Sequence, residues 1–102
     1  MSKKKCAMLI MNELFHPATD TARLDTSKVE NHILTVQNPE QAIALARQLK
    51  EQGFGAIEVC GAFGEQLARE MYLATDCTIP VGYVTIPEDQ LKQAFAFWKE
   101  DM

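Results

Sequence analysis

Hydrophobic residues in this chain follow two periods in alternation, one typical of buried strands and one typical of amphipathic helices. Cys6 to Met11 form an uninterrupted apolar run that ends in polar residues, as expected for a short strand covered on both faces. Similar runs rich in strand-forming residues recur further along the chain. We therefore expect four strands, over residues 6–11, 29–36, 56–60 and 79–86.

Three other segments place apolar residues at helical spacing. The first begins at Asn38, a good N-cap, has Pro39 at its first helical position and ends at Gly53. The second begins at Glu65, and the third follows residues 85–88, which match a capping box. The predicted buried faces are Ala42, Leu45, Ala46 and Leu49 in the first helix, Leu67, Ala68, Met71 and Tyr72 in the second, and Leu91, Ala94, Phe95 and Trp98 in the third.

The expected order β-β-α-β-α-β-α defines an α/β fold, with a four-stranded, mainly parallel sheet and three helices in one small domain over residues 1–102. The last three strands should be parallel, because each helical crossover returns the chain in the same direction. The helices should then cover the sheet. The direction of the first strand stays open, since residues 12–28 form a connection long enough for either sense. Such a long connection indicates a functional loop or a cover.

Composition removes several classes of protein. A chain of 102 residues is too short for a complete (β/α)₈ barrel, which needs at least about 200. The net charge of −4 gives no general attraction to phosphate backbones, so we expect no nucleic-acid partner. The apolar runs fall short of the ~18 residues of a membrane span, so we expect no membrane partner either.

Cysteine and histidine content bears on compartment and cofactors. Cys6, Cys60 and Cys77 are odd in number and form no CxxC pair, which indicates free thiols in a reducing compartment. We therefore expect a cytoplasmic protein. With His16 and His32 as the two histidines, the sequence predicts no metal site and no cofactor.

Ligands of open α/β sheets bind beyond the carboxyl ends of the strands. This rule selects Cys60, Gly61 and Thr85 as candidates. Asn12 and the loop that contains His16 join them if the first strand is also parallel. His16 is the residue expected to fold over such a site.

Glu58 and Cys60 share one face of the third expected strand, because side chains alternate along a strand. If helices cover that face, burial raises the pKa of the Glu58 carboxyl and suits it to general acid or base catalysis. The alternative is a salt-bridged Glu58 at a sheet edge or interface. Cys60 precedes a helix, whose dipole favours a reactive thiolate. The alternative for Cys60 is a small buried hydrophobe.

The turn Gly61-Ala62-Phe63-Gly64 is a candidate anion pocket, since its backbone N–H groups meet a helix N-terminus. Alternatively, the two glycines only permit a tight turn. Phe63 is expected either to project as a lid or ligand-stacking ring or to pack at a protomer contact.

His32 and Phe97 are two further candidates whose roles the sequence leaves open. His32 is expected beside the strand of Glu58, either paired with that carboxylate or simply half buried. Phe97 falls off the predicted buried face of the third helix, which makes that helix a candidate dimer interface.

The stretches Gly55–Gly64 and Val81–Val84 resemble a family of short, mostly bacterial proteins known only as a domain of unknown function. The resemblance extends over essentially the whole chain, including His16-Pro17 and Asn38–Gln41. It implies no activity. Its distinctive residues would be Glu58, Cys60, Gly61, Phe63 and Gly64.

Three hypotheses follow. The first is a homo-oligomeric cytoplasmic protein that binds a small anionic metabolite at the carboxyl edge of the sheet. The second is an enzyme that uses Glu58 as general acid or base on a carbonyl or carbon-acid substrate. The third is a non-catalytic oligomeric assembly or regulatory protein, which an exposed Phe97, a large apolar interface and the lack of a pocket beside Glu58 would favour. A second copy is expected to help build any site, because a four-stranded sheet has little area for a closed pocket.

Overall fold

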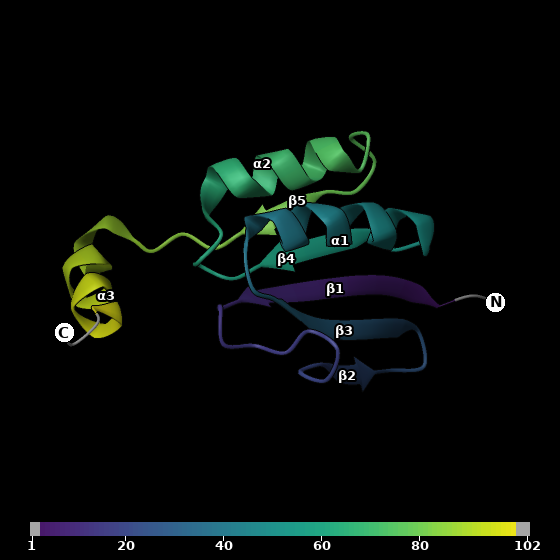
Figure 1. Cartoon of the computed structure of the whole chain (residues 1–102), viewed down its shortest axis with the longest axis horizontal. Coiled ribbons are helices and arrows are strands. Elements are labelled where there is room, and N and C mark those ends of the chain that lie inside the picture. The colour runs from purple at the N-terminus through teal and green to yellow at the C-terminus, as the bar shows by residue number, and fades with distance from the viewer. Residues whose placement is uncertain (1–2, 100–102) are drawn as a thin grey trace.

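One mixed sheet organises the computed structural model, which describes residues 3–99 (Figure 1). The strands run in the order β2-β3-β1-β4-β5, with β2 antiparallel to β3 and all other neighbours parallel. The elements are β1 (Lys4–Met11), β2 (Ala22–Asp25), β3 (Val29–Val36), α1 (Pro39–Glu51), β4 (Ala56–Val59), α2 (Gly64–Ala74), β5 (Val81–Tyr83), a 3₁₀ turn (Glu88–Gln90) and α3 (Leu91–Trp98).

The first strand occupies the centre of the sheet. β1 pairs in parallel with both β3 and β4, which settles the direction that the sequence left open. The crossover through α1 therefore passes over β1. The expected parallel arrangement of β3, β4 and β5 is confirmed.

The prediction of four strands is wrong by one. Residues 22–25 of the long connection form β2, an exposed edge strand that hydrogen bonds to β3. β5 is also shorter than the expected 79–86, since it spans Val81–Tyr83. Pro80 cannot donate a backbone hydrogen bond, which explains its place outside the strand.

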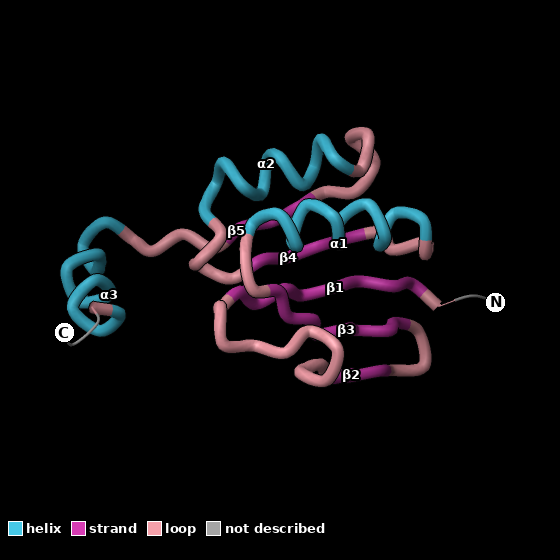
Figure 2. The backbone as a smooth tube through the Cα atoms, viewed as in Figure 1, coloured by secondary structure: helices cyan, strands magenta, loops and turns pink. Residues whose placement is uncertain are grey.

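Both large helices lie on the same face of the sheet (Figure 2). The core forms there, between alternate residues of the central strands and the inner faces of α1 and α2. Its members include Ala7, Leu9, Leu49, Ile57, Val59, Leu67 and Met71. The expectation that helices cover the sheet thus holds for one face. Within residues 3–99 no helix covers the other face, where Thr35 at the end of β3 is buried and donates a hydrogen bond of 2.9 Å to the Asp20 carbonyl.

Local chemistry fixes α1 as predicted. The Asn38 side chain accepts a hydrogen bond of 2.9 Å from the backbone N–H of Gln41, and Pro39 takes the first helical position. The Gln41 side chain in turn accepts a hydrogen bond of 2.8 Å from the N–H of Gln37. Gly53, at φ +84°, follows the helix end in the left-handed conformation that glycine adopts without strain.

The C-terminal segment departs from the main body. After β5 the chain runs through residues 84–87 to α3, which lies beyond the carboxyl ends of the strands and away from α1 and α2 (Figure 1). Among the described residues of α3 none is buried, so the predicted inner face of Leu91, Ala94, Phe95 and Trp98 is wrong for the single chain. The expected capping box does not form either.

Candidate functional site: the uncovered face of the sheet

The uncovered face is built by residues of one parity on each strand. In parallel pairs, Met8 of β1 lies beside Ile33 of β3 and Glu58 of β4, so all three point to the same side. Ile10 follows one pleat further along β1. We call this surface the open face; it consists of Cys6, Met8, Ile10, Leu24, Asn31, Ile33, Ala56 and Glu58.

The middle of the open face is apolar and accessible. Met8 is 47% exposed and Ile10 is 39% exposed, although both belong to the central strand. Leu24, on the edge strand β2, is 65% exposed. Ala7 and Leu9, which point to the other side of the same strand, are 0% and 1% exposed. The two faces at the middle of β1 therefore differ in environment.

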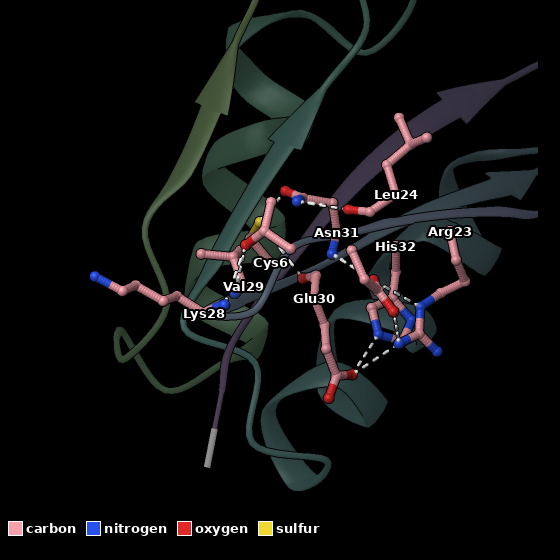
Figure 3. Close-up of polar contacts among 10 residues, drawn as sticks. Cys6, Arg23, Leu24, Lys28, Val29, Glu30, Asn31 and His32 are labelled. Carbon is pink, nitrogen blue, oxygen red and sulfur yellow. Dashed lines mark hydrogen bonds and ion pairs between the residues drawn. The ribbon is translucent and has the colours of Figure 1, made fainter. Parts of the chain in front are cut away.

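Polar groups join three strands at one end of the open face (Figure 3). The Cys6 thiol donates to the Asn31 side-chain oxygen at 2.9 Å, and the Asn31 amide donates to the Leu24 carbonyl at 2.8 Å. These bonds connect β1, β3 and β2. Cys6 is free, as are the other two cysteines of the described chain.

Glu58 is exposed on the open face, which corrects the expectation of a carboxylate buried beneath helices. No helix within residues 3–99 covers that side of β4. Its neighbour across β5 is Gly82, where an added Cβ would lie 3.8 Å from Glu58 Cγ. The burial on which a general acid or base depends is therefore lacking.

His32 does not pair with Glu58. β1 separates the two strands, and His32 points to the helix side of the sheet. Its Nε2 lies 3.0 Å from Glu30 Oε1, and its ring meets the Phe54 ring edge-on at 4.8 Å between centroids. His32 is therefore a half-buried histidine with contacts to Glu30 and Phe54, which corresponds to the second of its two expected alternatives.

Glu30 belongs to a charged cluster that the sequence did not indicate (Figure 3). The Arg23 guanidinium donates to Glu30 at 3.2 Å and to Asp25 at 2.7 Å. The hydrogen bond with His32, supported by the charge of Arg23, lowers the pKa of the Glu30 carboxyl. The hydrogen bond with Arg23 likewise lowers the pKa of Asp25. Arg23 and Asp25 lie on β2, so this cluster appears only once that strand is known.

The Gly61–Gly64 turn is partly as expected. Gly61 and Ala62 are exposed, and Gly64 adopts φ +77° at the start of α2. Phe63, however, is 7% exposed within the core, so it is neither a lid nor a protomer contact. Cys60 is half buried and packs against the same core, as in the alternative of a small hydrophobe.

The N-terminus of α2 lacks a side-chain cap, because Phe63 occupies that position and supplies no hydrogen bond. A carboxylate already stands in its first turn: Glu65 accepts a hydrogen bond of 3.0 Å from the Tyr83 hydroxyl. This bond raises the pKa of Tyr83.

The remaining candidates do not converge on the turn. The Asn12 side chain accepts a hydrogen bond of 2.9 Å from the N–H of Leu14. The exposed His16 donates a hydrogen bond of 2.7 Å from its backbone N–H to the Asp20 carboxylate. Gln37 donates to the Phe15 carbonyl at 2.8 Å, which ties the His16 loop to the end of β3. Thr85 is exposed in the segment that leads to α3.

Two open hollows occur on the described surface. One, of about 820 Å³, lies between α2 and β5 and is lined in part by Arg69, Tyr72 and Tyr83. The other, of about 410 Å³, lies between residues 17–18 and α1. Neither is lined by Glu58 or by the Gly61–Gly64 turn. Within residues 3–99 no group of His, Cys, Asp and Glu side chains is placed to hold a metal ion.

Fold and site together define a small α/β domain with a mostly parallel sheet and one uncovered face. The chain belongs to the family described as "Family of unknown function (DUF6506)", whose model matches residues 4–99. The resemblance noted in the sequence is thereby confirmed at the level of the family. No curated protein and no solved structure matches the chain. In the described part of the chain, no helix combines the length and the apolar character needed to cross a membrane.

Proposed function

We propose that this chain is an assembly subunit, whose open face is covered by a second copy of itself. The observation that carries the proposal is the exposure of Met8 and Ile10 on the central strand of a parallel sheet. Parallel sheets are normally covered on both faces, because their strands are apolar on both sides. A partner that buries the open face would complete this arrangement.

The total surface supports the proposal. The chain exposes 7526 Å² at a mass of 11.5 kDa, whereas a compact monomer of that mass exposes about 5,800 Å². The excess, about 1,700 Å² per chain, is more than the ~800 Å² that each partner contributes to an interface of standard size. Two such contributions fall in the range of obligate homodimer interfaces, roughly 2,000–5,000 Å².

The same geometry supports assembly over catalysis. Glu58 is exposed, and neither hollow of the described surface adjoins it. Phe97 is 75% exposed, as expected for a contact surface between chains. The exposure of Phe97 and the position of both hollows away from Glu58 are two of the three features that favour the third hypothesis; the third feature, a large apolar interface, is what the following experiment tests.

The test compares two leucine-sized apolar side chains of similar exposure. Met8→Lys places a charge on the open face, and Leu73→Lys places one on α2, where Leu73 is 54% exposed. We expect size-exclusion chromatography with light scattering to give a dimer for the wild type and for Leu73→Lys, and a folded monomer for Met8→Lys. A wild-type chain that stays monomeric at all accessible concentrations would refute the proposal.

A small anion at the Gly61–Gly64 turn is the second candidate, favoured by the missing side-chain cap of α2. The Glu65 carboxylate in the first turn opposes it, because a second negative charge would be repelled. Titration with inorganic phosphate at constant ionic strength tests it. A rise in melting temperature that Gly61→Ala abolishes would support binding, and an unchanged melting temperature would remove this candidate.

A further inference from the structure

α3 has no surface to pack on within its own described chain. It is eight residues long, and isolated helices shorter than ~12–15 residues are marginal in water. Its aromatic side chains Phe95, Phe97 and Trp98 are 70%, 75% and 78% exposed. Such a helix requires a partner surface to be stable.

The segment before α3 carries it outward. Val84 and Ile86 are 51% and 43% exposed, so apolar exposure continues through this segment. Pro87, at φ −53° and ψ 143°, is extended. Figures 1 and 2 show the chain leaving β5 and running past the carboxyl ends of the strands before α3 begins. We call residues 84–98 the arm.

The open face matches α3 in chemical character, and neither surface has a partner within the described chain. Both surfaces are mainly apolar. α3 contains one charged residue, Lys92, whereas the open face carries the Glu58 carboxylate beside Met8, with Lys4 on the same side at the far end of β1. Each chain therefore carries one apolar helix that packs on no surface of its own described chain, and one apolar sheet face that no helix of its own described chain covers.

We propose that two copies exchange their arms, so that α3 of each chain packs on the open face of the other. This inference rests on the proposed assembly function and specifies which segment of the second copy covers the sheet. A two-fold symmetric exchange covers both arms and both open faces at once, so neither surface stays available to bind further copies. Packing within one chain would instead require the extended segment 84–87 to reverse its direction.

The dimensions of the chain agree with an exchanged arm. Its radius of gyration is 14.5 Å, compared with about 13 Å for a compact chain of this length. Its longest extent is 49 Å, against 28 and 26 Å in the other two directions. Exchange would convert this elongated chain into one half of a compact dimer.

Trp98 is the only tryptophan in the sequence and lies in α3, so its fluorescence reports on the arm alone. The experiment measures molar mass by light scattering and Trp98 emission in the same wild-type samples, with the urea-unfolded chain as the reference for a water-exposed indole. Arm exchange predicts a dimer in which Trp98 emits at shorter wavelength than this reference. Met8→Lys should abolish the dimer and shift emission to the reference wavelength, and Leu73→Lys should do neither.

The other outcomes separate the two proposals. A dimer with water-exposed Trp98 would overturn arm exchange and leave the assembly proposal standing. A monomer with shielded Trp98 would show that the arm folds onto its own sheet, which refutes both. A monomer with exposed Trp98 would also refute both, and a heterologous partner would then be needed to cover the open face.

Discussion

At the scale of the residue, neighbours on β1 meet opposite environments. Leu9 is 1% exposed in the core, whereas Met8 is 47% exposed on the open face. The pleat of a strand turns successive side chains to opposite sides, so one position separates the core of the chain from the surface proposed to bind a second copy. A substitution at Leu9 should therefore affect the unfolding of the chain, whereas a substitution at Met8 should affect its association with a second copy.

Leu9→Ala should lower the free energy of unfolding by about 2–5 kcal/mol, since it opens a cavity in a packed core. Met8→Ala should change the unfolding of the dilute monomer by no more than about 1 kcal/mol, but it should weaken the dimer. Urea denaturation at low protein concentration measures the first effect, and sedimentation at increasing concentration measures the second. Equal losses of monomer stability for both variants would contradict the assignment of faces.

The Glu30 cluster makes a pH-dependent prediction. Its hydrogen bond with His32 lowers the pKa of Glu30 from the ordinary value of 4.5. A lowered pKa in the folded state means that the ionised carboxylate stabilises the fold above pH 4.5, and that this contribution is lost as the pH falls through the folded-state value.

Glu30→Gln should accordingly be less stable than the wild type at pH 7, and the difference should shrink as the pH is lowered from 7 to 3. Urea denaturation at both pH values measures it. Glu13→Gln, at an exposed position in the loop after β1, is the matched control for replacing one carboxylate by an amide. A Glu30→Gln deficit that persists unchanged at pH 3 would show that the carboxylate charge is not its source.

At the scale of the element, α1 is specified by its own sequence. Asn38 accepts a hydrogen bond from an N–H of the first turn, Gln41 accepts one from Gln37 just before the helix, and Gly53 follows the helix end. These signals are local, which is why the sequence alone predicted both ends of the helix and most of its inner face.

Asn38→Ala should destabilise the fold by about 1 kcal/mol, because a backbone N–H at the start of α1 loses its acceptor. Thermal or urea denaturation measures this loss. Gln48→Ala, on the exposed side of the same helix, should have little effect or a slightly stabilising one. If the two substitutions were equally harmless, the cap would not contribute to stability.

Other elements depend on contacts that a sequence does not display. β2 reads Ala-Arg-Leu-Asp, too short and polar to signal a strand, and it exists through its pairing with β3. In α3 the apolar spacing predicted a buried face that the described chain does not bury, because periodicity cannot say against which surface a helix packs. For the same reason Glu58 was expected beneath a helix: the sequence shows that the strand is apolar, and not which face stays uncovered.

At the scale of the whole molecule, the uncovered sheet and the projecting arm have one explanation. The chain is more elongated and exposes more surface than a compact monomer of its mass, and most of its exposed large hydrophobic residues lie on the open face or in the arm. If a second copy covers the open face as proposed, the candidate site is a surface shared between copies, and Glu58 contributes to it through its position on that surface.

Sedimentation equilibrium of the wild-type chain tests this claim most directly. We predict a mass twice the 11.5 kDa of one chain at micromolar concentration, and dissociation towards the single-chain mass on dilution. A mass of one chain that does not change with increasing concentration would contradict the central claim that a second copy covers the open face.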